Sequence, residues 1–150
     1  MTKPNLIYIL ADDMGYGDIS ALNENCGFRT PNLDEMAENG ICFTDAHATA
    51  AVCTPSRYGI LTGRYNWRSR LKSSVMGGYS EPLIERGRKT LADMLKDNGY
   101  RTAMVGKWHL GMSFAKEEGF VEKPDFDACD HVDYAGKIED SPVSHGFEYF

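Results

Sequence analysis

Two adjacent carboxylates, Asp12 and Asp13, directly follow an apolar run at residues 5–11. Like charges this close repel each other, so the pair needs a cation or hydrogen-bond donors to balance it. Carboxylate oxygens favour a hard cation, so Ca²⁺ or Mg²⁺ is the expected ion. The alternative is a turn or helix-capping pair without a metal, and the position alone leaves both interpretations open.

The thiol of Cys53 is a candidate nucleophile because it stands directly before Thr54-Pro55, a pair typical of a helix start. Free backbone N–H groups and the helix dipole at such a position attract anions and activate a thiol. Arg57 follows four positions later, one turn along the same face, and its guanidinium could reach back. The alternative is an ordinary buried cysteine.

A lysine and a histidine, Lys107 and His109, occupy a short segment between Gly106 and Gly111. The two glycines permit a tight loop, since glycine adopts backbone conformations that other residues avoid. Side chains two positions apart in such a loop can both face an anion. The alternative is a solvated surface loop with no such role.

Three helices are predicted from start signals and from the glycines that follow them. A Thr-Pro pair, or a Thr three positions before an acidic residue, is typical of a helix N-terminus, and a glycine can end a helix in the left-handed conformation. The starts are Thr30-Pro31, Thr54-Pro55 and Thr90, and the ends are Gly40, Gly63 and Gly99.

Three stretches predict β-strands, at residues 5–11, 41–46 and 100–105. The first is continuously apolar from Leu6 to Ala11, which is typical of a parallel strand buried on both faces. Strands that alternate with helices predict an α/β fold, a mostly parallel sheet flanked by helices with right-handed crossovers. Ligands bind beyond the carboxyl ends of such strands, where the carboxylate pair and the Lys-His pair would lie.

These groups together suit attack on a tetrahedral oxyanion ester. One strand end supplies carboxylates, another supplies a lysine and a histidine, and a helix start supplies a sulfur nucleophile. A metal ion and the cationic side chains would neutralise charge while the nucleophile attacks in line.

Length and charge exclude several classes of protein. The 150 residues make one domain at most, and a net charge of −6 argues against general nucleic-acid or anionic-membrane binding. The longest apolar run is too short to span a bilayer, and no signal peptide is visible. We therefore expect a cytoplasmic protein, or a periplasmic or secreted one if an export signal was removed. The four cysteines form no Cys-x-x-Cys pair, so no structural zinc site is expected.

The run from Cys53 to Arg64, CTPSRYGILTGR, resembles the sulfatase signature, in which Cys-x-Pro-Ser-Arg is followed by Thr-Gly-Arg. ILADDMGYGD, around Asp12-Asp13, resembles the first calcium motif of that family, and residues 106–111 are similar to its GKWHLG motif. The resemblance runs from residue 4 to residue 150. It implies the N-terminal part of a sulfatase catalytic domain with an alkaline phosphatase-like fold.

The resemblance also implies a role for each motif residue. Cys53 is oxidised by a formylglycine-generating enzyme to Cα-formylglycine, which is both nucleophile and metal ligand. Arg57 positions this group and offsets its charge, while Lys107 and His109 bind the sulfate and the oxygens of the nucleophile. The hydrated aldehyde attacks sulfur and releases the alcohol. Its second hydroxyl then loses its proton and expels sulfate, a route closed to plain Cys.

The resemblance assigns Asp12 and Asp13, with modified Cys53, to a Ca²⁺ ion. The departure from the family is length, because sulfatases run to several hundred residues and a later part brings a second pair of metal ligands. We therefore expect residues 1–150 to be the N-terminal part of a truncated domain that binds Ca²⁺ weakly and turns over poorly or not at all. An uncovered sheet edge would favour oligomerisation. His131 and His145 are expected at the surface or in structural roles.

The expected substrate is an aryl or carbohydrate sulfate. One alternative is a phosphonate or phosphate ester hydrolase of the same superfamily, and another is a non-catalytic fragment. Trp67, Arg68 and Arg70 could stack on and pair with a sulfated ring, or they could be a packed tryptophan with solvated arginines.

Overall fold

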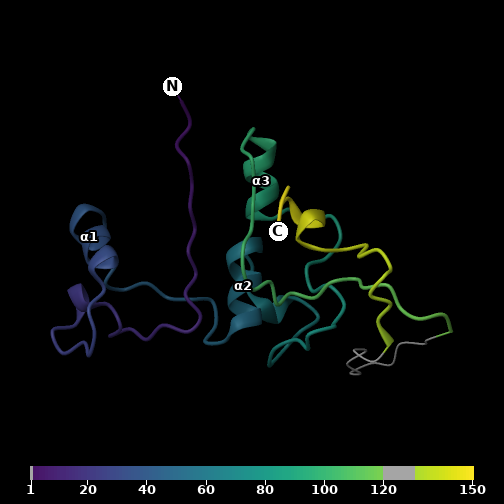
Figure 1. Cartoon of the computed structure of the whole chain (residues 1–150), viewed down its shortest axis with the longest axis horizontal. Coiled ribbons are helices and arrows are strands. Elements are labelled where there is room, and N and C mark those ends of the chain that lie inside the picture. Colours follow the sequence, from purple (N-terminus) through teal and green to yellow (C-terminus); the bar gives the residue numbers. More distant parts are fainter. Residues whose placement is uncertain (1, 120–130) are drawn as a thin grey trace. The chain divides into compact units, whose positions relative to one another are not determined.

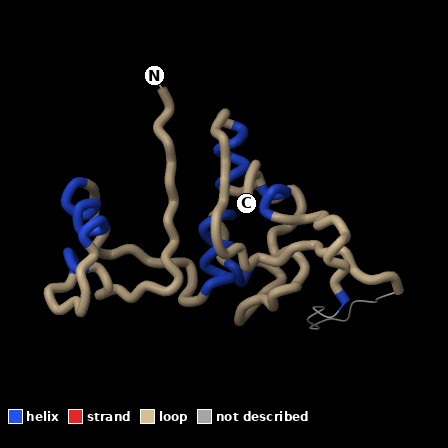
Figure 2. The backbone as a smooth tube through the Cα atoms, viewed as in Figure 1, coloured by secondary structure: helices blue, strands red, loops and turns tan. Residues whose placement is uncertain are grey.

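The computed structural model describes residues 2–119 and 131–150 and divides into two compact units, Met1–His47 and Ala48–Phe150. Short helices are joined by long loops (Figure 2). No helix in the described ranges is long and apolar enough to cross a membrane. The helical elements, several labelled in Figure 1, are η1 (Ser20–Leu22), α1 (Pro31–Asn39), α2 (Cys53–Thr62), η2 (Asn66–Arg68), α3 (Leu91–Asp97) and η4 (Pro142–His145).

The unit Met1–His47 is organised around the start of α1. Thr30 is the N-cap and Pro31 stands in the first turn, as the sequence predicts. Asp34 accepts hydrogen bonds from the Ser20 hydroxyl at 2.6 Å and from the Thr30 hydroxyl at 2.8 Å. The hydrogen bond from Ser20 is the main reason why the pKa of Asp34 lies below its ordinary value. Polar contacts between side chains therefore fix the start of α1.

α1 ends at Gly40 for a different reason from the predicted one. Gly40 has φ −120°, which is outside the left-handed region. A Cβ there would lie 2.7 Å from the Met36 carbonyl oxygen, so the close approach of the backbone requires glycine. Gly63 and Gly99, in contrast, adopt the predicted left-handed conformation, with φ 64° and 77°.

The strand predictions for residues 5–11 and 41–46 are wrong, since neither segment is a strand. The first was expected to be buried on both faces, yet Ile7 is 86% exposed, and Phe43 in the second is 76% exposed. A strand forms only where a second segment supplies the partners for its backbone groups, and neither stretch has such a ladder within the described residues. The mostly parallel sheet is therefore not present in this part of the chain.

The third predicted strand, residues 100–105, forms one parallel bridge between Ala103 and Tyr149. The Met104 N–H donates to the Tyr149 carbonyl at 2.9 Å, and the Glu148 N–H donates to the Thr102 carbonyl at 2.9 Å. This pairing follows the predicted direction but is too short to make a sheet.

The unit Ala48–Phe150 contains the hydrophobic core, where α2 packs against two loop segments. Tyr58, on α2, is fully buried, and its pKa is raised by burial and by the neighbouring Glu85 carboxylate. The two loop segments are joined by the Leu83 N–H, which donates to the Leu110 carbonyl at 2.8 Å. The core residues are Tyr58, Met76, Leu83, Ile84, Trp108 and Leu110.

α3 begins with the predicted capping box, in which Thr90 and Asp93 bond reciprocally. The Thr90 hydroxyl also donates to the His145 carbonyl at 2.7 Å. The buried Thr102 hydroxyl donates to the Gly146 carbonyl at 2.6 Å. These two hydroxyls hold the C-terminal segment against α3 and the 100–105 segment.

Candidate active site

α2 carries Cys53 in its first turn. The sequence analysis places Cys53 just before the helix, but the structure makes it the first helical residue, with extended Val52 as the N-cap. Ser56 closes the first turn of the helix, because its N–H donates to the Val52 carbonyl at 3.2 Å. Its hydroxyl donates to the Ala50 carbonyl before the helix at 2.8 Å. The half-buried thiol is therefore held at a fixed helix N-terminus.

Two side chains of α2 bind the loop that carries Lys107 and His109. The Arg57 guanidinium donates through Nη1 to the Lys107 carbonyl at 2.5 Å. The Thr54 hydroxyl donates to the His109 carbonyl at 3.0 Å. Because both bonds go to backbone atoms, they fix the course of the loop while leaving the side chains of Lys107 and His109 to other partners.

The loop has the sharp turns that its glycines predict. Gly106 and Gly111 have φ 104° and 75°, and His109 itself adopts φ 55°, which is uncommon for a residue with a side chain. Trp108 and Leu110, on either side of His109, are 7% and 1% exposed. The core therefore anchors both neighbours of His109 and holds its unusual backbone conformation in place.

The His109 ring is fixed by a segment that the sequence analysis left unassigned. Its Nε2 lies 2.8 Å from the Met76 carbonyl oxygen. Its Nδ1 is buried, with no hydrogen-bond partner in the described ranges. The Met76 N–H in turn donates to the Thr54 hydroxyl at 3.3 Å. No sequence signal reveals these contacts, because the partners are 22 and 33 positions apart.

Glu85 is another residue that sequence reasoning missed. It accepts hydrogen bonds from the Tyr58 hydroxyl at 3.0 Å, from Arg64 at 2.9 Å and from Arg88 at 2.7 Å. Burial pushes the pKa of Glu85 up, but hydrogen bonds from its own backbone N–H, Arg88 and Tyr58 outweigh burial and lower it. The carboxylate therefore ties α2 and the residues after it to the loop at residues 85–88.

The predicted metal ligands are divided between the two units. Asp12 and Asp13 lie in Met1–His47, whereas Cys53 lies in Ala48–Phe150. Within residues 2–119 and 131–150 there is no group of three or more His, Cys, Asp or Glu side chains able to hold a metal. The assignment of these three residues to a Ca²⁺ ion therefore stays a prediction.

Trp67 lies at the surface, and it is 60% exposed. Its ring stacks on Tyr65 with centroids 6.0 Å apart, and the Arg68 guanidinium lies 5.6 Å from the Trp67 ring centroid. The alternative of a packed tryptophan is therefore wrong for the described structure, although no ligand role follows from exposure alone.

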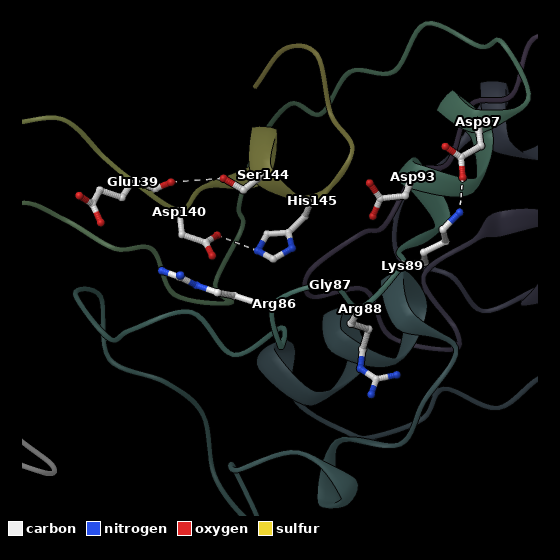
Figure 3. Close-up of a pocket in the computed structure, with 10 residues that line it drawn as sticks. All are labelled: Arg86, Gly87, Arg88, Lys89, Asp93, Asp97, Glu139, Asp140, Ser144 and His145. Carbon is white, nitrogen blue, oxygen red and sulfur yellow. Dashed lines mark hydrogen bonds and ion pairs between the residues drawn. The ribbon is translucent and has the colours of Figure 1, made fainter.

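A cavity of about 480 Å³ is lined in part by Asp93 and Asp97 of α3 (Figure 3). Its walls carry paired polar side chains: Asp140 lies 2.8 Å from His145 Nε2, and Lys89 forms an ion pair with Asp97. His145 is 5% exposed and stacks on Trp108, which fits the structural role expected of it. None of the predicted catalytic or metal-binding residues lines this cavity.

Comparisons with known proteins match the chain along nearly its whole length. The family model described as Sulfatase matches residues 4–149. The chain is 43% identical over 147 residues to an N-acetylgalactosamine-6-O-sulfatase of Bacteroides thetaiotaomicron, covering 98% of this chain and 26% of the relative. It is 40% identical over 154 residues to human steryl-sulfatase, covering 99% of this chain and 23% of the relative. The chain thus spans about a quarter of the length of these relatives.

A solved structure also matches nearly the whole of this chain. It comes from work on the metabolism of multiple glycosaminoglycans by Bacteroides thetaiotaomicron, and it matches with a TM-score of 0.78 at 42% identity. The match covers 99% of this chain and 28% of the other. The arrangement of short helices and loops described above is therefore shared with a larger protein.

Proposed function

Because the chain belongs to the sulfatase family, we propose that it supplies the nucleophile-bearing part of a site that hydrolyses sulfate esters. The observation that carries this proposal is the pair of contacts from α2 to one loop. Arg57 binds the Lys107 carbonyl and Thr54 binds the His109 carbonyl, so one helix start and one cationic loop are joined. This is the combination of nucleophile, cation and imidazole that attack on an oxyanion ester requires.

The proposed nucleophile is Cys53 after conversion to Cα-formylglycine by a formylglycine-generating enzyme. The hydrated aldehyde would supply two hydroxyls on one carbon, one to attack sulfur and one to release sulfate. Lys107 then offsets the negative charge of the sulfate group, and Arg57 orients the modified residue from one turn along α2. His109 holds or moves a proton at the oxygens next to sulfur.

A Ca²⁺ ion is the proposed metal, held by Asp12, Asp13 and the oxygen carried at residue 53. Two carboxylates are the hard oxygen donors that Ca²⁺ prefers, so the donor set fits the ion in kind. Six to eight oxygens normally surround this ion, so three ligands fit only part of its shell. The ion would draw negative charge away from the sulfate group.

The proposed substrate is an aryl or carbohydrate sulfate. The names of the two relatives above refer to an amino-sugar sulfate and a steryl sulfate, which share the sulfate ester and differ in the alcohol. The shared chemistry therefore supports a sulfuric ester hydrolase without selecting the alcohol.

The test is turnover of 4-nitrophenyl sulfate by the protein purified from its native source. A phenylphosphonate ester serves as the competing substrate, and Cys53→Ala serves as the control without a nucleophile. We expect sulfate hydrolysis that depends on Cys53 and exceeds phosphonate hydrolysis. Faster phosphonate hydrolysis would favour a phosphonate or phosphate ester hydrolase of the same superfamily. Hydrolysis of neither ester would favour a non-catalytic fragment.

A further inference from the structure

The Thr54 hydroxyl has an unusual set of partners for a residue in the first turn of a helix. Thr54 is fully buried, and both of its hydroxyl bonds go to distant segments. It donates to the His109 carbonyl at 3.0 Å and accepts from the Met76 N–H at 3.3 Å. One side chain next to Cys53 thus connects α2 to two loops, through partners that lie 22 and 55 positions away in the sequence.

A third hydrogen bond closes a ring among the same three residues. His109 Nε2 lies 2.8 Å from the Met76 carbonyl oxygen. Because a carbonyl oxygen can only accept, His109 must carry a proton on Nε2. In the neutral imidazole, Nδ1 is then the atom with the free lone pair, and it is buried with no hydrogen-bond partner within the described ranges.

The three hydrogen bonds among Thr54, Met76 and His109 also constrain the backbone of His109. With φ 55°, His109 turns its carbonyl toward Thr54 while Trp108 and Leu110 stay in the core. Loss of the Thr54 hydroxyl would leave the His109 carbonyl and the Met76 N–H without their partner in a buried place. The His109 ring would then be held only by its remaining bond to a loop that had lost an anchor.

We propose that Thr54 is a positioning residue whose hydroxyl fixes the orientation and the Nε2–H tautomer of His109 relative to the helix that carries Cys53. Nδ1 is thereby kept as the proton-accepting atom of His109. The catalytic consequence rests on the proposed function, whereas the tautomer and the hydrogen-bonded ring rest on geometry alone. Thr54 itself touches no reacting atom in this proposal and acts through His109.

The first test is the tautomer of His109, measured by long-range ¹H–¹⁵N NMR on the protein produced from its complete gene. Signals of His109 are assigned by their loss in a His109→Gln variant. We expect the Nε2–H form in the wild type and in Thr54→Ser, and a mixture of tautomers in Thr54→Val. An Nδ1–H imidazole in the wild type would overturn the proposal whether or not any variant folds.

The second test is kinetic, with turnover normalised to the fraction of protein that carries the aldehyde at residue 53. Thr54→Val should lower kcat for 4-nitrophenyl sulfate by about 10-fold to 100-fold, with KM changed by less than about threefold. Thr54→Ser restores the hydroxyl and should stay within about threefold of the wild type in kcat.

The matched control is Thr102→Val, which also removes a buried hydroxyl that donates to a distant carbonyl, that of Gly146. The Thr102 hydroxyl takes no part in the hydrogen bonds among Thr54, Met76 and His109, so Thr102→Val should leave both the tautomer and kcat unchanged. Equal losses in Thr54→Val and Thr102→Val would overturn the positioning role. Absence of sulfate turnover in the wild type would instead contradict the proposed function. An Nε2–H tautomer in the wild type that becomes a mixture in Thr54→Val would still support the positioning role of Thr54.

Discussion

The two units of the molecule differ in what holds them together. In Ala48–Phe150, side chains such as Tyr58, Leu83 and Leu110 are 0–2% exposed. In Met1–His47 none of the described residues is buried, and Asp34 is held by hydrogen bonds from the hydroxyls of Ser20 and Thr30. A core forms where several segments of the chain converge, so an apolar stretch alone, such as residues 5–11, does not produce one.

The candidate site is divided in the same way. The proposed catalytic groups lie in the packed unit, where contacts from Arg57 and Thr54 hold the loop of Lys107 and His109. The proposed Ca²⁺ ligands Asp12 and Asp13 lie in the unit without buried residues. Substitutions of Lys107 in one unit and of Asp13 in the other are therefore expected to have separable effects, the first on the chemistry and the second on the metal affinity.

The largest effect is expected from removing the nucleophile of the packed unit. Cys53→Ala leaves no side chain that can become an aldehyde, so turnover of 4-nitrophenyl sulfate should fall by about 10³-fold or more. The fold should be retained, because Cys53 contributes no side chain to the core cluster. Residual turnover above a tenth of the wild-type value would contradict the role of Cys53.

A pair of variants separates the two units directly. Lys107→Ala should lower kcat/KM by about 10²-fold through the loss of a cation beside the sulfate, with Ca²⁺ affinity unchanged. Asp13→Asn should weaken Ca²⁺ binding by about tenfold, because affinity depends on the charge of the ligands. Calorimetric titration and steady-state kinetics on both variants give the comparison. Equal effects of both variants on Ca²⁺ affinity would contradict the proposal that Asp13 binds the metal and Lys107 does not.

Much of the local structure follows from the sequence, and little of the long-range structure does. Thr90 with Asp93 predicts its helix start correctly because a capping box involves neighbouring residues only. The strands at residues 5–11 and 41–46 fail because pairing depends on a partner segment. In the site, motifs single out Arg57 and His109, but the hydroxyl that joins the two loops is invisible until the chain has folded.

Two glycines allow a test of packing in each unit. Gly146 has φ 93°, and a Cβ there would lie 2.3 Å from the backbone nitrogen of Asp93 on α3. Gly146→Ala should therefore lower the free energy of unfolding by about 2 kcal/mol. Gly27→Ala, with open space around its Cβ position, should change it by less than about 0.5 kcal/mol. Denaturant unfolding of both variants measures the two losses of unfolding free energy. Equal destabilisation would contradict the predicted difference in packing at the two glycines.

The smallest expected effect is a pH-dependent loss of stability at Glu85. Its pKa is lowered in the folded protein, so its contribution is complete above its unfolded pKa and is lost as the pH falls through the folded value. Glu85→Gln should therefore cost about 1 kcal/mol of unfolding free energy at pH 7, with the difference shrinking in acid. The matched control is Glu35→Gln on exposed α1. A cost for Glu85→Gln that does not vary with pH would contradict the role of the charge.

The most direct test of the account is a peptide map by mass spectrometry of the protein from its native source. It reads the chemical state of residue 53 without depending on any substrate. We predict a peptide in which Cys53 has become an aldehyde that reacts with hydroxylamine. An intact Cys53 thiol in all of the protein would contradict the proposed sulfatase chemistry and leave only the family's fold.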